Sequence, residues 1–217
     1  VAFRIPNLLR DLFAEGALSA AFVPTFTAAL REDRARAWRL FNVVLNAVAV
    51  LLGLLVAAII VFAPEVVTAL ASGYDASKLG LAASLTRITA PFLVLVSAAA
   101  LAMGSLNACG PVFVPSLAPA LFNCAMIARA LVLPKVLPSW GYEPVAALAI
   151  GAVAGGALQL LVQVPLLWRE GCRWRPAWDL KDPGLVRIAR MMGPAVIGMA
   201  IVQVSILIDT QFASRIP

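Results

Sequence analysis

The sequence has no histidine, few cysteines and few charged residues, and each shortage argues against a class of protein. Its three cysteines, Cys109, Cys124 and Cys172, show no CxxC spacing. Without histidine beside them, neither a zinc site nor a cysteine–histidine catalytic pair is expected. Only 13% of the residues are charged, 62% are hydrophobic, and the mean hydropathy is +0.95. These values lie far outside the soluble globular range and predict an all-α, polytopic transmembrane helix bundle.

Several motifs of enzymes and soluble domains are also missing. No glycine-rich phosphate loop, tandem repeat or low-complexity tract occurs. No pair of nucleophile and base stands out, so we expect neither an enzyme nor a cofactor, and no metal site. A coupling ion or a dependence on the membrane potential stays open.

The net charge of +6 is concentrated in two short segments, residues 31–39 and 168–190. This distribution is typical of cytoplasmic membrane loops and predicts contact with membrane lipids. Trp168, Trp174 and Trp178 alternate with basic residues in the second segment, a pattern that could also bind single-stranded nucleic acid. Next to a membrane span, an interfacial loop is favoured, and no nucleic-acid partner is expected.

Long charge-free runs predict six helices in a single transmembrane domain, residues 1–217. Residues 40–64, for example, run 25 positions without a charge, and about 20 suffice to cross the hydrocarbon. Residues 65–87 and 134–143 are then placed on the side opposite to the two basic segments. The expected helices span approximately residues 1–30, 40–63, 88–107, 113–133, 145–167 and 190–213.

The opening stretch, residues 1–24, is apolar enough for a membrane but carries charges. At 100° per residue, Arg4, Asn7, Asp11 and Glu15 form one polar stripe with Arg10 at its edge. Ionisable groups at bilayer depth usually line a path or pair inside a bundle. A surface-lying amphipathic helix is the alternative.

The stretch AFRIPNLLRDLFAEGALSAAFVP resembles the second-helix signature of the MurJ (MviN) family, bacterial flippases of the MOP exporter superfamily. The stretches GSLNACGPVFVPSLAPALFN, GGALQLLVQVPLL and MMGPAVIGMAIVQVSILIDTQFAS resemble the same family in the same order. The resemblance implies half of a two-lobed transporter that carries lipid-linked peptidoglycan precursor (lipid II) across the cytoplasmic membrane by alternating access. The chain, which begins with valine, would match the second to seventh of fourteen helices and be a fragment lacking the first helix and most of the second lobe.

The same resemblance suggests roles for individual residues. It implies that Arg10 lines the substrate cavity, with Arg4 and Asn7 beside it. It places Glu15 near the cavity gate, where we also group Asp11 and Ser19. Asp209, near the end of the last helix, is expected to pair with an arginine, bind a coupling cation or face outer headgroups. Lipid II is the expected partner, with other cell-wall synthesis proteins as a further possibility.

Pro111, Pro115, Pro119 and Asn123 recur every four residues and share one helical face. Prolines beyond the first turn remove backbone hydrogen bonds and bend a helix, so this face is either a hinge or a static kink.

Amides and glycines also recur at helical spacing. Asn42 and Asn46 are expected to make interhelical hydrogen bonds or to line a cavity, while Gly151 and Gly155 predict close helix packing.

Two other functions remain open from the sequence. One is another exporter of the MOP type, for a polysaccharide-linked lipid or for drugs in exchange for cations. The other is a membrane scaffold that transports nothing and whose polar groups only pack helices.

Overall fold

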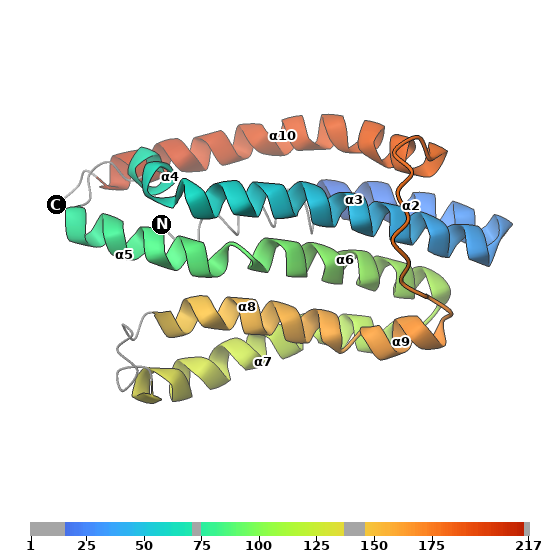
Figure 1. Ribbon diagram of the computed structural model, residues 1–217, viewed down its shortest axis with the longest axis horizontal. Coiled ribbons are helices and arrows are strands. Elements are labelled where there is room, and N and C mark those ends of the chain that lie inside the picture. The colour runs from blue at the N-terminus through green and yellow to red at the C-terminus, as the bar shows by residue number, and fades with distance from the viewer. Residues whose placement is uncertain (1–15, 71–74, 137–145, 215–217) are drawn as a thin grey trace.

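The computed structural model describes residues 16–70, 75–136 and 146–214. In this part of the chain every regular element is a helix, and the long helices run side by side along the long axis of the molecule (Figure 1). Three stretches are long and apolar enough to cross a membrane, at 34–61, 76–109 and 146–169, and a shorter apolar helix covers 113–128. The all-α membrane bundle is therefore confirmed.

Helix α2 (Ala17–Glu32) and helix α3 (Arg34–Val61) are separated only by Asp33. The carboxylate of Asp33 accepts hydrogen bonds from the backbone N–H groups of Ala35 and Arg36, both at 3.1 Å, and so starts α3. The expectation of a loop at residues 31–39 is wrong for this reason. Arginine is a good helix former, and one capping aspartate is enough for α3 to begin well before Leu40.

Helices α4 (Ala63–Leu70), α5 (Ala76–Thr89) and α6 (Phe92–Cys109) follow. The stretch from 76 to 109 is nearly continuous and is interrupted only at Ala90 and Pro91. The expected helix at 88–107 is therefore part of a longer helical stretch. Pro91 lacks an N–H and interrupts the helical hydrogen bonds, but the chain continues in the same direction beyond it. Gly110, with φ of 119°, ends α6.

Helix α7 (Phe113–Val136) packs along helix α8 (Ala146–Leu161), and the short α9 (Val164–Arg169) continues α8 after a break. The close approach depends on glycine, because a Cβ at Gly155 would lie 2.7 Å from Cδ2 of Phe122. A Cβ at Gly156 would likewise lie 2.8 Å from Cδ2 of Phe92. The packing role expected for Gly155 is confirmed, and Gly156 extends it to α6.

The last helix, α10 (Pro183–Ser214), begins before the expected residue 190. The carboxylate of Asp182 accepts hydrogen bonds from the N–H groups of Gly184 and Leu185 at 2.8 and 3.2 Å. Pro183 occupies the first position of α10, where an N–H would have no partner within the helix, so proline is well tolerated there. Pro194 therefore lies inside α10.

The helices form successive layers, with α10 at one edge, α2 and α3 next, then α5 and α6, and finally α7 and α8 (Figure 1). A cluster of four aromatic rings fills the core between α2 and α3. Neighbouring ring centroids lie 5.4 to 6.4 Å apart, mostly edge to face, for Phe22, Phe26, Trp38 and Phe41. This cluster fixes α2 against α3 at the end where the two basic segments meet.

Candidate functional site

Most residues expected at the substrate cavity lie outside the described part of the chain. These are Arg4, Asn7, Arg10, Asp11 and Glu15. Ser19 lies on α2 and is half-buried. The backbone of Asp209 belongs to α10, but its side chain is outside the described set.

Helix α2 contains the last residues of the opening stretch, from Ala17 to Pro24. Its buried face packs against α3, α6 and α10. The contact with α6 is close, because a Cβ at Gly104 would lie 2.8 Å from the side chain of Val23. The opposite face presents the exposed residues Ala20, Pro24 and Ala28. Helix α2 therefore packs one face into the core and leaves a face of small residues exposed.

The three prolines of the expected hinge face occupy different places. Pro111 precedes α7, and Pro115 lies in its first turn. The N–H groups of the first turn make no helical hydrogen bond, so proline costs none there. Only Pro119 lies in the helix interior, where it removes the bond to the carbonyl of Pro115. Pro115 is buried, whereas Pro119 and Asn123 are exposed. The repeat thus contains one helix-bending proline, and its use as a hinge stays a prediction.

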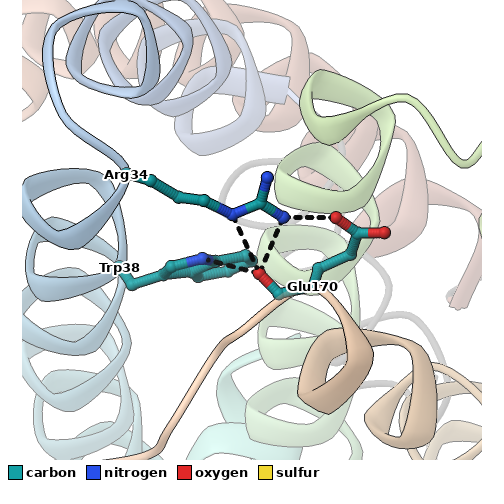
Figure 2. A network of polar contacts seen from close by, with 3 residues as sticks. All are labelled: Arg34, Trp38 and Glu170. Atoms are coloured by element: carbon teal, nitrogen blue, oxygen red, sulfur yellow. Dashed lines mark hydrogen bonds and ion pairs between the residues drawn. The ribbon is translucent and has the colours of Figure 1, made fainter.

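The two basic segments meet at one end of the bundle, which we call the basic end. The guanidinium of Arg34 donates to the carbonyl oxygen of Glu170 through Nε at 3.2 Å and Nη2 at 2.8 Å. It also pairs with the Glu170 carboxylate. The indole Nε1 of Trp38 donates to the same carbonyl at 3.0 Å, so three donors converge on one oxygen (Figure 2). That oxygen belongs to the C-terminal end of α9, where positive charge is favourable.

Residues 170–182 form a strap that leads from α9 to α10 across the bundle (Figure 1). The strap begins at Gly171, whose φ of +87° suits glycine. There the N–H of Cys172 bonds the carbonyl of Leu167 at 2.9 Å, and that of Gly171 bonds the carbonyl of Trp168 at 3.1 Å. These two bonds form a Schellman motif, which ends α9 and turns the chain toward α3.

Two buried asparagines of α3 hold the strap by its backbone. Nδ2 of Asn42 donates to the carbonyl of Arg173 at 2.9 Å, and its Oδ1 accepts from the N–H of Arg175 at 3.4 Å. Nδ2 of Asn46 donates to the carbonyls of Arg175 and Ala177 at 3.2 and 3.1 Å. Each side-chain amide thus bonds to backbone N–H or C=O groups of the strap that have no partner in a helix or sheet. Their role differs from both expectations, since they bind a connecting segment.

The residues that hold the strap form a regular series on α3. Arg34, Trp38, Asn42 and Asn46 are spaced four apart, so they share one helical face. Arg39 adds an ion pair with Asp179 at 3.2 Å. The two asparagines stand out as a pair in the sequence, but their continuation toward Arg34 was not predicted, because residues 31–39 were expected to form a loop. The spacing of four was the signal available.

A polar cavity of about 140 Å³ lies at the basic end between α2, α3 and α10. It is lined by two acidic and two basic side chains together with Thr25 and small residues. One acid–base couple, Glu32 with Arg36, forms an ion pair across the α2–α3 junction. Asp182 caps α10, and Arg187 supplies a further charge. The cavity can therefore hold water and polar groups, with its charges largely balanced.

Cys172 belongs to the strap and is buried, with 4% of the residue exposed. Burial raises its pKa from the ordinary value of 9.0 to about 11, and the nearby Cys109 adds to this. A thiol with so high a pKa stays protonated near neutral pH and is a poor nucleophile. Cys172 therefore acts as a packing residue of the basic end.

The sequence matches known membrane proteins over its whole length. A sequence profile described as Lipid II flippase MurJ matches residues 1–217. The chain is 37% identical to the "Probable lipid II flippase MurJ" of Haemophilus influenzae, covering 98% of this chain and 43% of that protein. It is 39% identical to the "Lipid II flippase MurJ" of Burkholderia cenocepacia, covering 100% and 42% respectively.

A solved structure titled "Lipid II flippase MurJ, inward closed conformation" has the same fold. It superposes with a TM-score of 0.76 at 22% identity, over 100% of this chain and 43% of that one. The chain thus spans less than half the length of the curated relatives it matches. Since the profile covers every residue, the chain belongs to the Lipid II flippase MurJ family.

Proposed function

We propose that the protein to which this chain belongs moves lipid II across the bacterial inner membrane by alternating access, with this chain as one lobe. The observation that carries the proposal is the family match over all 217 residues. The names of the relatives from H. influenzae and B. cenocepacia describe the same activity. This is a transport function, and it supplies precursor for peptidoglycan synthesis.

The substrate is an anionic lipid-linked sugar, and the opening motif suits it chemically. Arginine keeps its charge and offers a planar fork of donors to phosphate oxygens. We assign the headgroup contact to Arg10, with Arg4 and Asn7 beside it, and a gating role to Glu15 with Asp11 and Ser19. Asp209 remains a candidate for ion pairing or cation coupling. A cation-exporting drug transporter would instead favour an acidic cavity.

The arrangement of the described helices is compatible with this assignment. Helix α2, which contains the last residues of the opening stretch, packs against α3, α6 and α10. A charged motif leading into a central helix is better placed for a cavity than one on a peripheral helix. A scaffold that only packs helices would have no need for several ionisable residues in such a position.

We place the basic end in the cytoplasm, following the excess of Lys and Arg in the segments that meet there. Ala35 is exposed at this end. In a cysteine-free full-length protein, Ala35→Cys should be protected from an impermeant thiol reagent in intact cells. Labelling without permeabilisation would reverse the orientation.

The experiment that tests the transport proposal is complementation of a flippase-depleted strain by the full-length protein. Arg10→Ala should abolish growth, and Arg10→Lys should restore it only in part, because an ammonium keeps the charge but loses the planar fork. Arg31→Ala is the matched control, an exposed arginine in the last turn of α2. Headgroup binding is measured in parallel at matched expression. Normal growth and normal precursor binding with Arg10→Ala would refute the assignment and favour the scaffold.

A further inference from the structure

A second cavity near the basic end has no part in the proposed transport site. It measures about 190 Å³ and lies between α3, α6, the α8–α9 pair and the start of the strap. Its lining is almost wholly apolar. The side chains that matter below are Phe41, Ala98, Trp168, Cys172 and Trp174. We call this cavity the strap crevice.

Two tryptophans connect the strap crevice to the surface. Trp168 and Trp174 both line it, yet they are 58% and 63% exposed. The indole Nε1 of Trp174 donates to Oδ1 of Asn46 at 3.3 Å, which fixes this ring against α3. Tryptophan is enriched at the level of lipid headgroups, because the ring is apolar and its N–H is polar. An opening bordered by exposed tryptophans is typical of the depth at which an acyl chain meets its headgroup.

Two arginines without an acidic partner are neighbours in sequence of residues that line the crevice. Arg169 and Arg173 directly follow two lining residues, Trp168 and Cys172, and both arginines are exposed. The neighbouring acid Glu170 is already paired with Arg34. Asp179, the other acid of the strap, is paired with Arg39. Among the residues that the structure describes, Arg169 and Arg173 therefore have no ion-pair partner.

An apolar crevice in which two lining residues are each followed by an exposed, uncompensated arginine suits one kind of ligand, a molecule with an anionic head and a hydrocarbon chain. We propose that the strap crevice binds an anionic phospholipid of the surrounding leaflet. One acyl chain lies against Phe41, Ala98 and Trp174, and the phosphate contacts Arg169 and Arg173. Arginine suits the phosphate because it donates several charge-assisted hydrogen bonds.

The charge pattern distinguishes this ligand from other occupants. An apolar protein segment would leave Arg169 and Arg173 unpaired. A zwitterionic lipid would fill the crevice but bring its own positive charge to the arginines. Within a bilayer the crevice gains little from hydrophobicity alone, because lipid tails are already in an apolar solvent. Selectivity should therefore come from the headgroup and retention from the fit of the chain.

The first test measures selectivity on the full-length protein by native mass spectrometry. Phosphatidylglycerol and phosphatidylcholine with the same acyl chains are added in turn, and the bound fraction is recorded. The unaltered protein should prefer phosphatidylglycerol. The double substitution Arg169→Gln and Arg173→Gln should reduce that preference by roughly thirtyfold, since each of the two basic residues near an anionic headgroup contributes about fivefold. Lys181→Gln, a charge removal on the same strap, should leave it unchanged.

The second test measures the chain site. Ala98→Leu partly fills the crevice and should reduce retention of both lipids, whereas Ala57→Leu, on the exposed face of α3, should not. Quenching of tryptophan fluorescence by phosphatidylglycerol brominated on its acyl chains checks the same point without a crevice substitution. Phe substitutions at Trp168 and Trp174 should remove most of this quenching. An unchanged lipid preference in the double arginine variant overturns the proposal, as does quenching that survives loss of both tryptophans.

Discussion

Asn46 offers the most direct test of how the strap is held. We expect Asn46→Ala to release the strap from α3 while leaving the helices folded. The side chain is 7% exposed and makes three hydrogen bonds, two to strap carbonyls and one from the indole of Trp174. Alanine makes none of these. The strap would keep only its contacts through Asn42, Trp38 and the two ion pairs.

The magnitude follows from the number of bonds. A typical intramolecular hydrogen bond contributes about 0.5 to 1.5 kcal/mol net. Three bonds of 3.1 to 3.3 Å, near the long end of the range, give roughly 2 to 3 kcal/mol for Asn46. At about 1.4 kcal/mol per factor of ten, strap opening should become roughly 30 to 150 times more frequent. The change concerns local opening, so the free energy of global unfolding should fall less.

Hydrogen–deuterium exchange of the full-length protein measures this opening. The amide of Arg175, which donates to Asn42, should exchange faster by that factor, together with its neighbours in the strap. Amides in the middle of α3 should not change. Asn123→Ala removes an exposed amide on α7 and serves as the control. Unchanged strap exchange in Asn46→Ala would show that the strap is held by something other than these side-chain amides.

Three further predictions follow from the structure. Gly155→Leu should lower stability by about 1 to 3 kcal/mol, because its Cβ would collide with an aromatic ring of α7, and a thermal unfolding scan of the purified protein should show the loss. In a protein whose other cysteines are replaced by serine, maleimide labelling of Cys172 should rise about tenfold per pH unit up to its pKa near 11, and a plateau near pH 9 would contradict the burial argument. The contribution of that buried thiol to stability is present below pH 9 and is lost as the pH rises toward 11. Finally, Pro119→Ala should reduce complementation several-fold while Pro115→Ala leaves it near normal, since only Pro119 removes an interior helical bond; equal growth with both would make the bend static.

The sequence predicted the helical class and the approximate spans because long apolar runs have few other solutions. It predicted the starts of helices poorly where a capping aspartate begins a helix inside a charged segment. Asp33 and Asp182 each begin a helix inside a segment that was expected to be a loop, since a carboxylate can satisfy the first free N–H groups of a helix. Positive charge indicated the side of the membrane but did not reveal that the charged residues were helical.

The contacts of the site were harder to predict than the spans. Asn42 and Asn46 were recognised as a pair, but their partners lie about 130 residues further along the chain and are backbone atoms. Backbone carbonyls carry no residue-specific signal, so sequence alone cannot identify them. Gly155 was easier, because glycine at helical spacing already indicates a close approach. The roles of Arg10 and Glu15 depend on family resemblance and stay predictions.

The strap also sets a mechanical limit on the bundle. A helical connection can unwind and lengthen, whereas a segment that is already drawn out across the bundle has little slack, because even a fully extended chain spans at most about 3.3 to 3.6 Å per residue. Residues 172–179 contain no helix and link α9 to the start of α10 (Figure 1). At the basic end, α10 can therefore withdraw from α9 only a short distance. Any larger excursion of α10 has to be a pivot, with its far end swinging outward about the point where the strap ends.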